Sequence, residues 1–323
     1  MSSVQVTLNS VQEARRRIVN VIHRTPLYFC PRLSELTNAK VYLKLECYQP
    51  IRVFKIRGAA NKILKMPIED RKRGLVAASS GNHGLAVSYL AKYVGTPATI
   101  VVPSTAVEEK IRAIEENGAK VVKHGLFHDE RESKALEIQK TTGAVFIHPF
   151  DDPDVIAGQG TIGLEISEDL ADVDTVIVPI GGGGLISGIS TAIKSLKPAA
   201  KILGVEPEKA SSMYQSIKQG KIVRLTDTTS IAEGLAARQP GVNTFEIAKR
   251  NVEEILLVTE EQIKNALFMV MRDCHLVVEP SAAAAFAGLV EKYKPKFGEK
   301  IVVVVSGGNV SLKLLGSILS EHA

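Results

Sequence analysis

Residues 175–189 read TVIVPIGGGGLISGI: an apolar run, then four consecutive glycines, then apolar residues at helical spacing. A continuous apolar run suits a strand that is buried on both faces of a parallel sheet. In open α/β sheets, ligands bind beyond the carboxyl ends of the strands, near the N-termini of the following helices. The backbone N–H groups of Gly181, Gly182, Gly183 and Gly184 can converge there on an anion, so the stretch predicts a phosphate site.

The absence of two known phosphate-binding patterns limits which phosphate compounds the glycine run could bind. Wherever the dinucleotide fingerprint G-x-G-x-x-G is begun in the glycine run, it fails at Leu185, Ile186 or Ser187. The P-loop of nucleoside triphosphate sites needs a lysine and a serine or threonine after its last glycine, where Leu185 and Ile186 stand. A compact phosphomonoester remains the best candidate. The alternative is a tight strand-to-helix turn that binds no ligand.

Similar β-rich runs alternate with amphipathic stretches along the chain, which predicts an α/β fold with a mainly parallel sheet. The runs are AKVYLKLE, GLVAASS, ATIVVP, AKVVKHG, GAVFIHP, TVIVPI, AKILGVEP and EKIVVVVSGGN. The alternation within residues 67–151 predicts a smaller inserted domain, and residues 1–66 and 152–323 the larger domain. We expect Ser104 or Thr105 to cap the helix that follows them and Gly118 to end it.

Composition excludes several classes of function. Hydrophobic residues make up 45% and charged residues 23% of the 323 residues, which is ordinary for a globular protein. No apolar run is long enough to cross a bilayer, and the N-terminus lacks the apolar core of a signal peptide, so we expect a cytoplasmic protein without a membrane partner. The net charge of +5 comes from scattered basic residues, so nucleic acid binding is not indicated.

The three cysteines, Cys30, Cys47 and Cys274, have no CxxC or other metal-ligand spacing. Neither a disulfide framework nor a structural zinc site is therefore predicted. We expect the cysteines to be small buried apolar side chains.

Two further stretches carry groups that suit catalysis. VFKIRGA places Lys55 between Phe54 and Ile56. Apolar surroundings lower the pKa of a lysine, and its neutral amine can then form a Schiff base, although a surface lysine is the ordinary alternative. ASSGNHG places polar side chains, Asn82 and His83 among them, on a turn between a strand and a helix.

Taken together and in this order, six motifs resemble those of the fold-type II pyridoxal-phosphate enzymes, in the branch of the threonine and serine dehydratases and serine racemase. The motifs are QPIRVFKIRGA, SSGNHG, HPFDDPDVIAGQGTIGLEI, VPIGGGGLISGI, EP at Glu279 and Pro280, and VVVSGGNV. The likeness extends over residues 25–314. It implies two open, twisted, mainly parallel sheets flanked by helices, a homodimer or homotetramer, and a small amino-acid substrate.

The resemblance also implies residue roles. Lys55 would carry pyridoxal 5'-phosphate, with Phe54 packed against the ring, Asn82 on the phenolic oxygen and Ser306 on the pyridine nitrogen. The cofactor phosphate would be held by Gly181, Gly182, Gly183, Gly184 and the N–H of Leu185. The substrate carboxylate would be received by Ser79, Ser80, Asn82 and His83.

The implied reaction is a β-elimination that converts L-threonine and L-serine to a 2-oxo acid and ammonia. A serine hydroxyl at the pyridine nitrogen supports a pyridinium less well than an aspartate, which favours loss of a β-leaving group. Lys55 would remove the Cα proton, and the cofactor phosphate would protonate the departing hydroxyl. In racemase relatives the residue matching Ser80 faces the ring from the other side, so Ser80 is expected either to transfer a proton or only to bind the carboxylate.

Several positions depart from the family pattern. Arg52 and Val53 stand where many relatives carry Gly-Ser. Arg131 matches an arginine near the substrate in racemase-like members and could receive a second carboxylate, although a solvated arginine is the alternative. Glu206 and Ala210 match two positions of a divalent-cation site. Because Ser212 replaces an expected aspartate, we expect a weakened site and predict no firm metal ligand.

Competing functions remain at this point. A serine racemase or 3-hydroxyaspartate dehydratase is the nearest alternative, favoured by Ser80 and Arg131 and disfavoured by Ser212. A non-catalytic, cofactor-binding regulatory protein is an alternative of another class, suggested by Arg52 and Val53. A nicotinamide-dependent oxidoreductase is disfavoured by the missing dinucleotide fingerprint.

Overall fold

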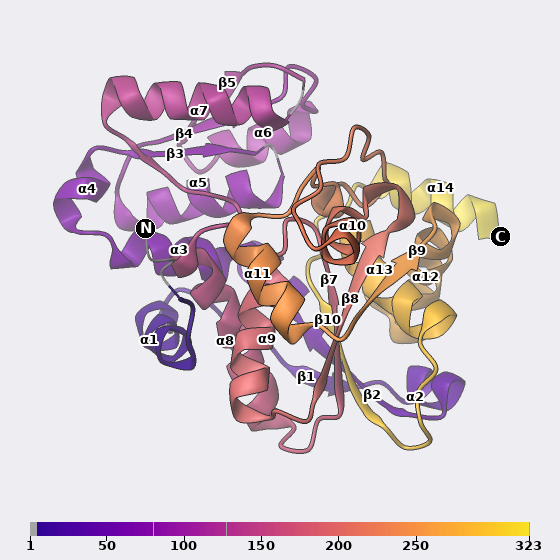
Figure 1. Cartoon of the computed structure of the whole chain (residues 1–323). Helices are drawn as coiled ribbons and strands as arrows, with labels where there is room; N and C mark the ends of the chain where they lie inside the picture. The colour runs from indigo at the N-terminus through magenta and orange to yellow at the C-terminus, as the bar shows by residue number, and fades with distance from the viewer. Residues whose placement is uncertain (1–4, 80, 127, 323) are drawn as a thin grey trace.

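The computed structural model describes residues 5–79, 81–126 and 128–322, which fold into two sheets flanked by helices (Figure 1). The larger sheet has the strand order β1-β2-β10-β7-β8-β9, and its neighbours pair in parallel except β1 with β2. Its strands are β1 (Leu27–Phe29), β2 (Lys40–Leu45), β7 (Thr175–Pro179), β8 (Lys201–Pro207), β9 (Glu254–Val258) and β10 (Lys300–Val305).

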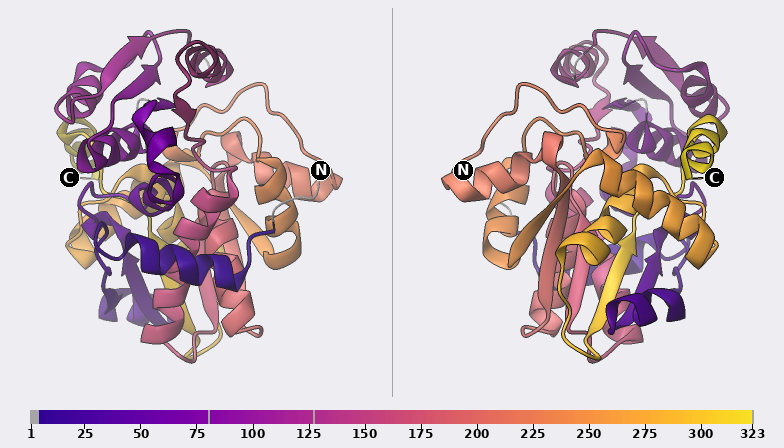
Figure 2. Two further views of the ribbon diagram at one scale, coloured as in Figure 1. Left: turned by 90° about the vertical axis from the view of Figure 1, so that its left-hand side faces the viewer. Right: turned by 90° about the vertical axis from the view of Figure 1, so that its right-hand side faces the viewer.

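The smaller sheet is wholly parallel, with the order β5-β4-β3-β6, and lies above the larger one in Figures 1 and 2. Its strands are β3 (Leu75–Ala78), β4 (Ala98–Val102), β5 (Lys120–Lys123) and β6 (Val145–Phe146). All four strands come from one continuous stretch of chain. The division into a domain of residues 67–151 and one of residues 1–66 and 152–323 stays a prediction.

Helices cover both faces of each sheet. One face of the larger sheet packs against α2 (Pro31–Thr37), α12 (Glu260–Cys274), α13 (Pro280–Ala287) and α14 (Leu312–His322). The other face packs against α8 (Pro153–Asp169), α9 (Gly184–Leu196), α10 (Ser212–Gln219) and α11 (Val242–Asn251). The core around the smaller sheet includes residues from α3 (Lys55–Lys65), α5 (Asn82–Val94), α6 (Glu108–Glu115) and α7 (His128–Thr142), while α1 (Leu8–Ile18) packs on α8 and α4 (Ile68–Lys72) precedes β3.

The strand predictions agree with this architecture, with two omissions and one wrong helix cap. Each of the eight predicted runs contains a strand, but β1 and β9 were not predicted. α6 begins at Glu108 after Val107 and has no side-chain cap, so the prediction of Ser104 or Thr105 as its cap is wrong. No helix in the described part of the chain is long and apolar enough to cross a membrane.

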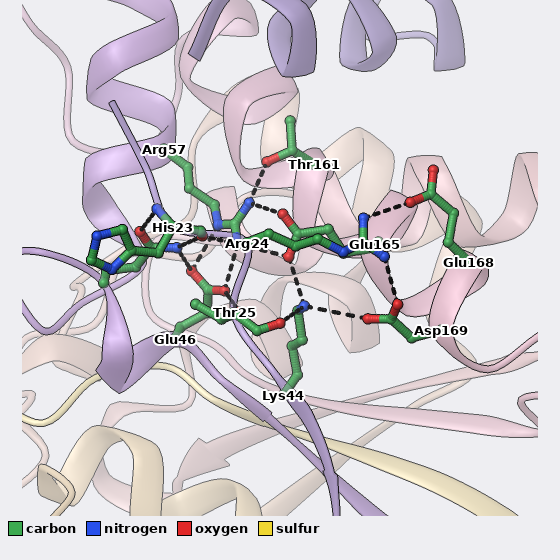
Figure 3. Close-up of polar contacts among 12 residues, drawn as sticks. His23, Arg24, Thr25, Lys44, Glu46, Arg57, Thr161, Glu165, Glu168 and Asp169 are labelled. Carbon is green, nitrogen blue, oxygen red and sulfur yellow. Dashed lines mark hydrogen bonds and ion pairs between the residues drawn. The ribbon is translucent and has the colours of Figure 1, made fainter. Parts of the chain in front are cut away.

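A buried network of charges fastens α3 to the larger sheet and to α8 (Figure 3). The guanidinium of Arg57, which is fully buried, donates to both carboxylate oxygens of Glu46 at 2.8 Å and to those of Glu165 at 2.7 and 2.9 Å. Lys44, also fully buried, lies 2.6 Å from Glu165 and donates to the Thr25 carbonyl. Two cations thus balance two carboxylates in the interior, which offsets the cost of removing them from water.

Candidate active site

Lys55 is the first residue of α3, two residues before Arg57 in the buried network. The backbone N–H of the preceding Phe54 donates to the carbonyl of Ser306 at 3.0 Å, which holds the helix start against the end of β10. The Nζ atom of Lys55 lies 5.2 Å from the centroid of the Phe54 ring and donates to the Pro149 carbonyl at 2.7 Å. Burial lowers the pKa of Lys55 from 10.5 to about 8, against the opposing charge of Glu279. A neutral amine is therefore accessible near physiological pH.

The glycine run forms the connection between β7 and α9, as predicted from the sequence. A Cβ atom at Gly182 would lie 2.4 Å from the Phe150 ring, and one at Gly181 would lie 2.7 Å from the Gly234 carbonyl. Gly183 has a φ of +93°, which side chains rarely adopt, and it precedes the first helical residue, Gly184. Close packing therefore requires residues without side chains at these positions. The first N–H groups of α9 have no acceptor within the helix.

The chain at Pro149 and Phe150 is held by the next residue, Asp151. Its carboxylate accepts the backbone N–H groups at the start of α11, from Val242, Asn243 and Thr244 at 2.9, 2.9 and 3.1 Å. The aspartate thus caps a helix of another part of the chain. This contact keeps the carbonyl that faces Lys55 and the ring that faces the glycine run in place.

Asn82, the first residue of α5, meets a carboxylate that the sequence motifs did not assign a role. Its Nδ2 atom donates to both carboxylate oxygens of Glu279, at 2.9 and 2.8 Å, and its Oδ1 atom accepts from Asn309 at 2.8 Å. Burial raises the pKa of Glu279 to about 7, against the hydrogen bonds from Asn82. Glu279 is 197 positions away from Asn82 in the sequence, so no local pattern could reveal the pair.

The remaining residues of the ASSGNHG turn are partly placed. The Ser79 hydroxyl accepts the N–H of Gly81 at 3.2 Å, and His83 is buried with Nε2 2.8 Å from the Ile147 carbonyl. The predicted catalytic and carboxylate-binding residue Ser80 lies outside the described residues. The turn thus lies at the carboxyl end of β3, next to the Asn82–Glu279 pair.

Residues 18–307 match the family model described as pyridoxal-phosphate dependent enzyme. The chain belongs to this family. It is 46% identical to an L-threonine ammonia-lyase of Thermotoga maritima, over 98% of this chain and 79% of that protein. It is 37% identical to an L-threo-3-hydroxyaspartate ammonia-lyase of Saccharomyces cerevisiae, over 97% of this chain and 96% of that protein. A maize serine racemase structure superimposes with a TM-score of 0.93 at 37% identity, covering 98% of each chain.

The described residues fit the cofactor of this family. The glycine connection has no room for side chains, and the bare N–H groups at the start of α9 suit a phosphate. Lys55 offers an amine of lowered pKa. The side chain of Ser306 is buried at the end of β10, next to the start of α3. The predicted cofactor positions thus come from separate parts of the chain: α3, the β7–α9 connection and the end of β10.

Arg131 was predicted from the resemblance as a residue that could receive a second carboxylate of the substrate. It lies in α7, where it donates to the Leu126 carbonyl at 3.0 Å and is partly buried. Burial lowers the pKa of Arg131. Its suggested role in binding a second carboxylate stays a prediction. Glu233 forms an ion pair with Lys110 of α6.

Glu206, the candidate cation ligand, is fully buried at β8 and accepts the backbone N–H groups of Met213 and Tyr214 at 2.9 and 2.8 Å. Burial raises its pKa to about 8 despite these hydrogen bonds. Within the described residues, no three His, Cys, Asp or Glu side chains form a group that could hold a metal ion. The weakened cation site inferred from Ser212 stays a prediction.

The raised pKa of Glu206 gives a testable pH dependence. The folded state favours the protonated carboxyl, so its contribution to stability is complete below the unfolded pKa near 4.5 and is lost as the pH rises through about 8. Glu206→Gln removes this loss, so the variant should gain about 4 kcal/mol relative to the unchanged protein between pH 5 and 9. Urea unfolding in the presence of a chelator measures it. The exposed neighbour variant Glu208→Gln should show no such trend, and a pH-independent Glu206→Gln difference would contradict the assignment.

Proposed function

We propose that the protein deaminates L-threonine and L-serine to a 2-oxo acid and ammonia, with pyridoxal phosphate as cofactor. The observation that carries the proposal is the Lys55 amine of lowered pKa, held at the start of α3 by the Pro149 carbonyl. The relatives named L-threonine ammonia-lyase support threonine as the substrate. They match 98% and 96% of this chain.

The cofactor contacts that we propose are those that the resemblance to the family implies. Lys55 would bind the cofactor covalently and Phe54 would pack against its ring. Asn82 would hydrogen-bond the phenolic oxygen and Ser306 the pyridine nitrogen. The phosphate would be held by the N–H groups of Gly181, Gly182, Gly183, Gly184 and Leu185. When bound, the cofactor withdraws electrons from the substrate Cα and makes its proton acidic.

The protein groups then orient the substrate and move its proton. Ser79, Ser80, Asn82 and His83 would bind the carboxylate and fix the Cα–H bond toward Lys55. An amine with a pKa of about 8 is well matched to remove and return protons near neutral pH. The Ser306 hydroxyl carries no charge, so the site gives less support to a positive pyridine nitrogen than an aspartate would, and this favours expulsion of the β-hydroxyl.

A second candidate function has specific support. The match to L-threo-3-hydroxyaspartate ammonia-lyase and to serine racemase structures makes hydroxyaspartate deamination or racemisation the alternative activity. The experiment supplies the holoenzyme with threonine, serine or 3-hydroxyaspartate, and follows both 2-oxo acid release and the chirality of the remaining amino acid. Fastest 2-oxo acid release from threonine supports the proposal. Inversion without release, or release from hydroxyaspartate alone, replaces it with the alternative. A protein that holds the cofactor but turns over none of the substrates is the regulatory protein.

The lowered pKa of Lys55 predicts how cofactor binding depends on pH. Only the neutral amine can attack the aldehyde of pyridoxal phosphate, so attachment to the apoprotein should accelerate as the pH rises through about 8 rather than 10.5. Glu279→Gln removes a negative charge that raises the Lys55 pKa, so this midpoint should move to lower pH. Visible absorption of the bound cofactor gives the rate. A midpoint near 10.5, or one that rises in Glu279→Gln, would contradict the burial argument.

We also propose that the protein works in the cytoplasm as a homodimer or homotetramer. The ordinary globular composition is consistent with this compartment. Light scattering after size-exclusion chromatography measures the assembly. A mass equal to one chain at micromolar concentration would contradict the oligomer.

A further inference from the structure

Cys30 and Cys274 lie in contact although 244 positions separate them in the sequence. Their Sγ atoms are 3.6 Å apart. Cys30 directly precedes α2, Cys274 is the last residue of α12, and the two helices pack against each other (Figure 1). The prediction of a small buried side chain is confirmed for Cys30, whereas Cys274 is partly exposed, and only the fold brings the two thiols together.

The surroundings of the two thiols differ from those of the third cysteine. Cys30 is buried and Cys274 is partly exposed, so the pair can be reached from solvent on one side. The hydrogen bond from the Cys274 thiol lowers the pKa of Cys30 to about 7. By contrast, burial raises the pKa of Cys47 to about 11. A thiolate, which is the reactive form, is thus available in the pair and not at Cys47.

A disulfide would require a small movement of the two side chains. Its sulfur atoms are about 2.05 Å apart, so the pair must close by about 1.5 Å, a distance on the scale of side-chain rotation. Both cysteines stand at ends of elements, where the backbone is less constrained than within a helix. His275, which follows Cys274, has a φ of 54° and ends α12.

We propose that Cys30 and Cys274 form a reversible disulfide on reaction with a hydroperoxide such as hydrogen peroxide. One thiolate attacks a peroxide oxygen, the O–O bond breaks, and a sulfenic acid and hydroxide form, which takes up a proton to become water. The second sulfur then attacks the sulfenic sulfur, forms the S–S bond and releases a second water with its own proton. Two electrons pass from the sulfurs to the peroxide. A dithiol reductant restores the two thiols by exchange.

The disulfide would link two helices that pack near the larger sheet, α2 and α12. It would close a loop of 244 positions between the edge strand β1 with α2 and the end of α12. Such a link restricts the unfolded chain and stabilises the folded one. Because the chain passes from Cys274 through a short connection to Glu279, the disulfide would also anchor the segment that brings Glu279 to Asn82.

The experiment treats the full-length protein with hydrogen peroxide, blocks free thiols, and maps the peptides by mass spectrometry without reduction. We expect one cross-linked peptide that contains Cys30 and Cys274, a free Cys47, and a melting temperature about 5 °C higher than in the reduced protein. Dithiothreitol should reverse both changes.

The three serine variants separate this disulfide from general oxidation. Cys30→Ser and Cys274→Ser should each abolish the cross-link and the temperature shift, whereas Cys47→Ser should retain both. Because Cys274 is partly exposed, Cys274→Ser remains informative where Cys30→Ser folds poorly. Oxidation of either thiol to sulfinic or sulfonic acid without a cross-link would overturn the proposal. A cross-link between two chains, a link that involves Cys47, or an unchanged melting temperature would overturn it as well.

Discussion

Lys55→Ala should remove both covalent attachment of pyridoxal phosphate and turnover, with a loss of activity of about a thousandfold or more. The amine would form the bond to the cofactor and move the substrate proton, so no neighbouring group replaces it. The variant should be colourless after dialysis, and borohydride should fix no cofactor to it. In the unchanged protein, borohydride treatment and peptide mapping should place the cofactor on Lys55.

A matched control lies on the same helix. Lys65 is half exposed and pairs with Asp154 at 2.7 Å near the end of α3. Lys65→Ala should therefore keep the colour and the activity. Retention of a borohydride-stable cofactor in Lys55→Ala would refute the assignment of the lysine. Equal loss in both variants would show that the effect comes from α3 itself.

Arg57→Met should destabilise the fold by about 3–5 kcal/mol, the largest stability effect that we expect from one substitution. The arginine donates to the carboxylates of both Glu46 and Glu165, and its removal leaves two buried anions facing each other with Lys44 as their cation. Unfolding by guanidinium chloride at pH 7 measures the change. The difference should shrink as the pH falls, because protonation neutralises the Glu46 carboxylate, whose pKa Arg57 lowers despite the burial of the group.

Arg24 provides the comparison at the rim of the same network. It pairs with Glu168 at 2.7 Å and with Asp169 at 2.5 Å, but its side chain is 51% exposed. Because solvent screens such pairs, Arg24→Met should cost less than about 1 kcal/mol. Similar changes in the two variants would contradict the view that burial makes the Arg57 contacts important.

The sequence was sufficient for those features that are local in the chain. The glycine run could be read as a strand-to-helix connection because apolar periodicity changes on either side of it, and Lys55 and Asn82 stand at the helix starts where ligand groups gather. The resemblance of the motifs then supplied the family, which the matched relatives confirm. Strands such as β7 and β10 could be predicted because burial on both faces makes them continuous apolar runs.

The features that the sequence did not predict all depend on contacts between residues far apart in the sequence. The edge strand β1 has only three residues, of which Tyr28 and Phe29 are exposed, so it lacks a buried apolar run. Glu279 acquires its neighbour Asn82, and Cys30 its neighbour Cys274, only when the sheets form. Glycine is also needed in the run for a reason that the sequence did not suggest, since the ring of Phe150 occupies the space beside Gly182.

The hydrogen bond from Lys55 to the Pro149 carbonyl has a mechanical consequence. The two residues are 94 positions apart, and Lys55 precedes the first strand of the smaller sheet while Pro149 follows the last. The hydrogen bond therefore joins the two segments of chain that connect this sheet to the rest of the molecule. A free ammonium has three protons to donate, whereas a nitrogen bonded to a cofactor keeps at most one. Attachment of the cofactor to Lys55 therefore weakens this hydrogen bond to the Pro149 carbonyl. Attachment of the cofactor at Lys55 thus alters a hydrogen bond that joins the two chain segments flanking the smaller sheet.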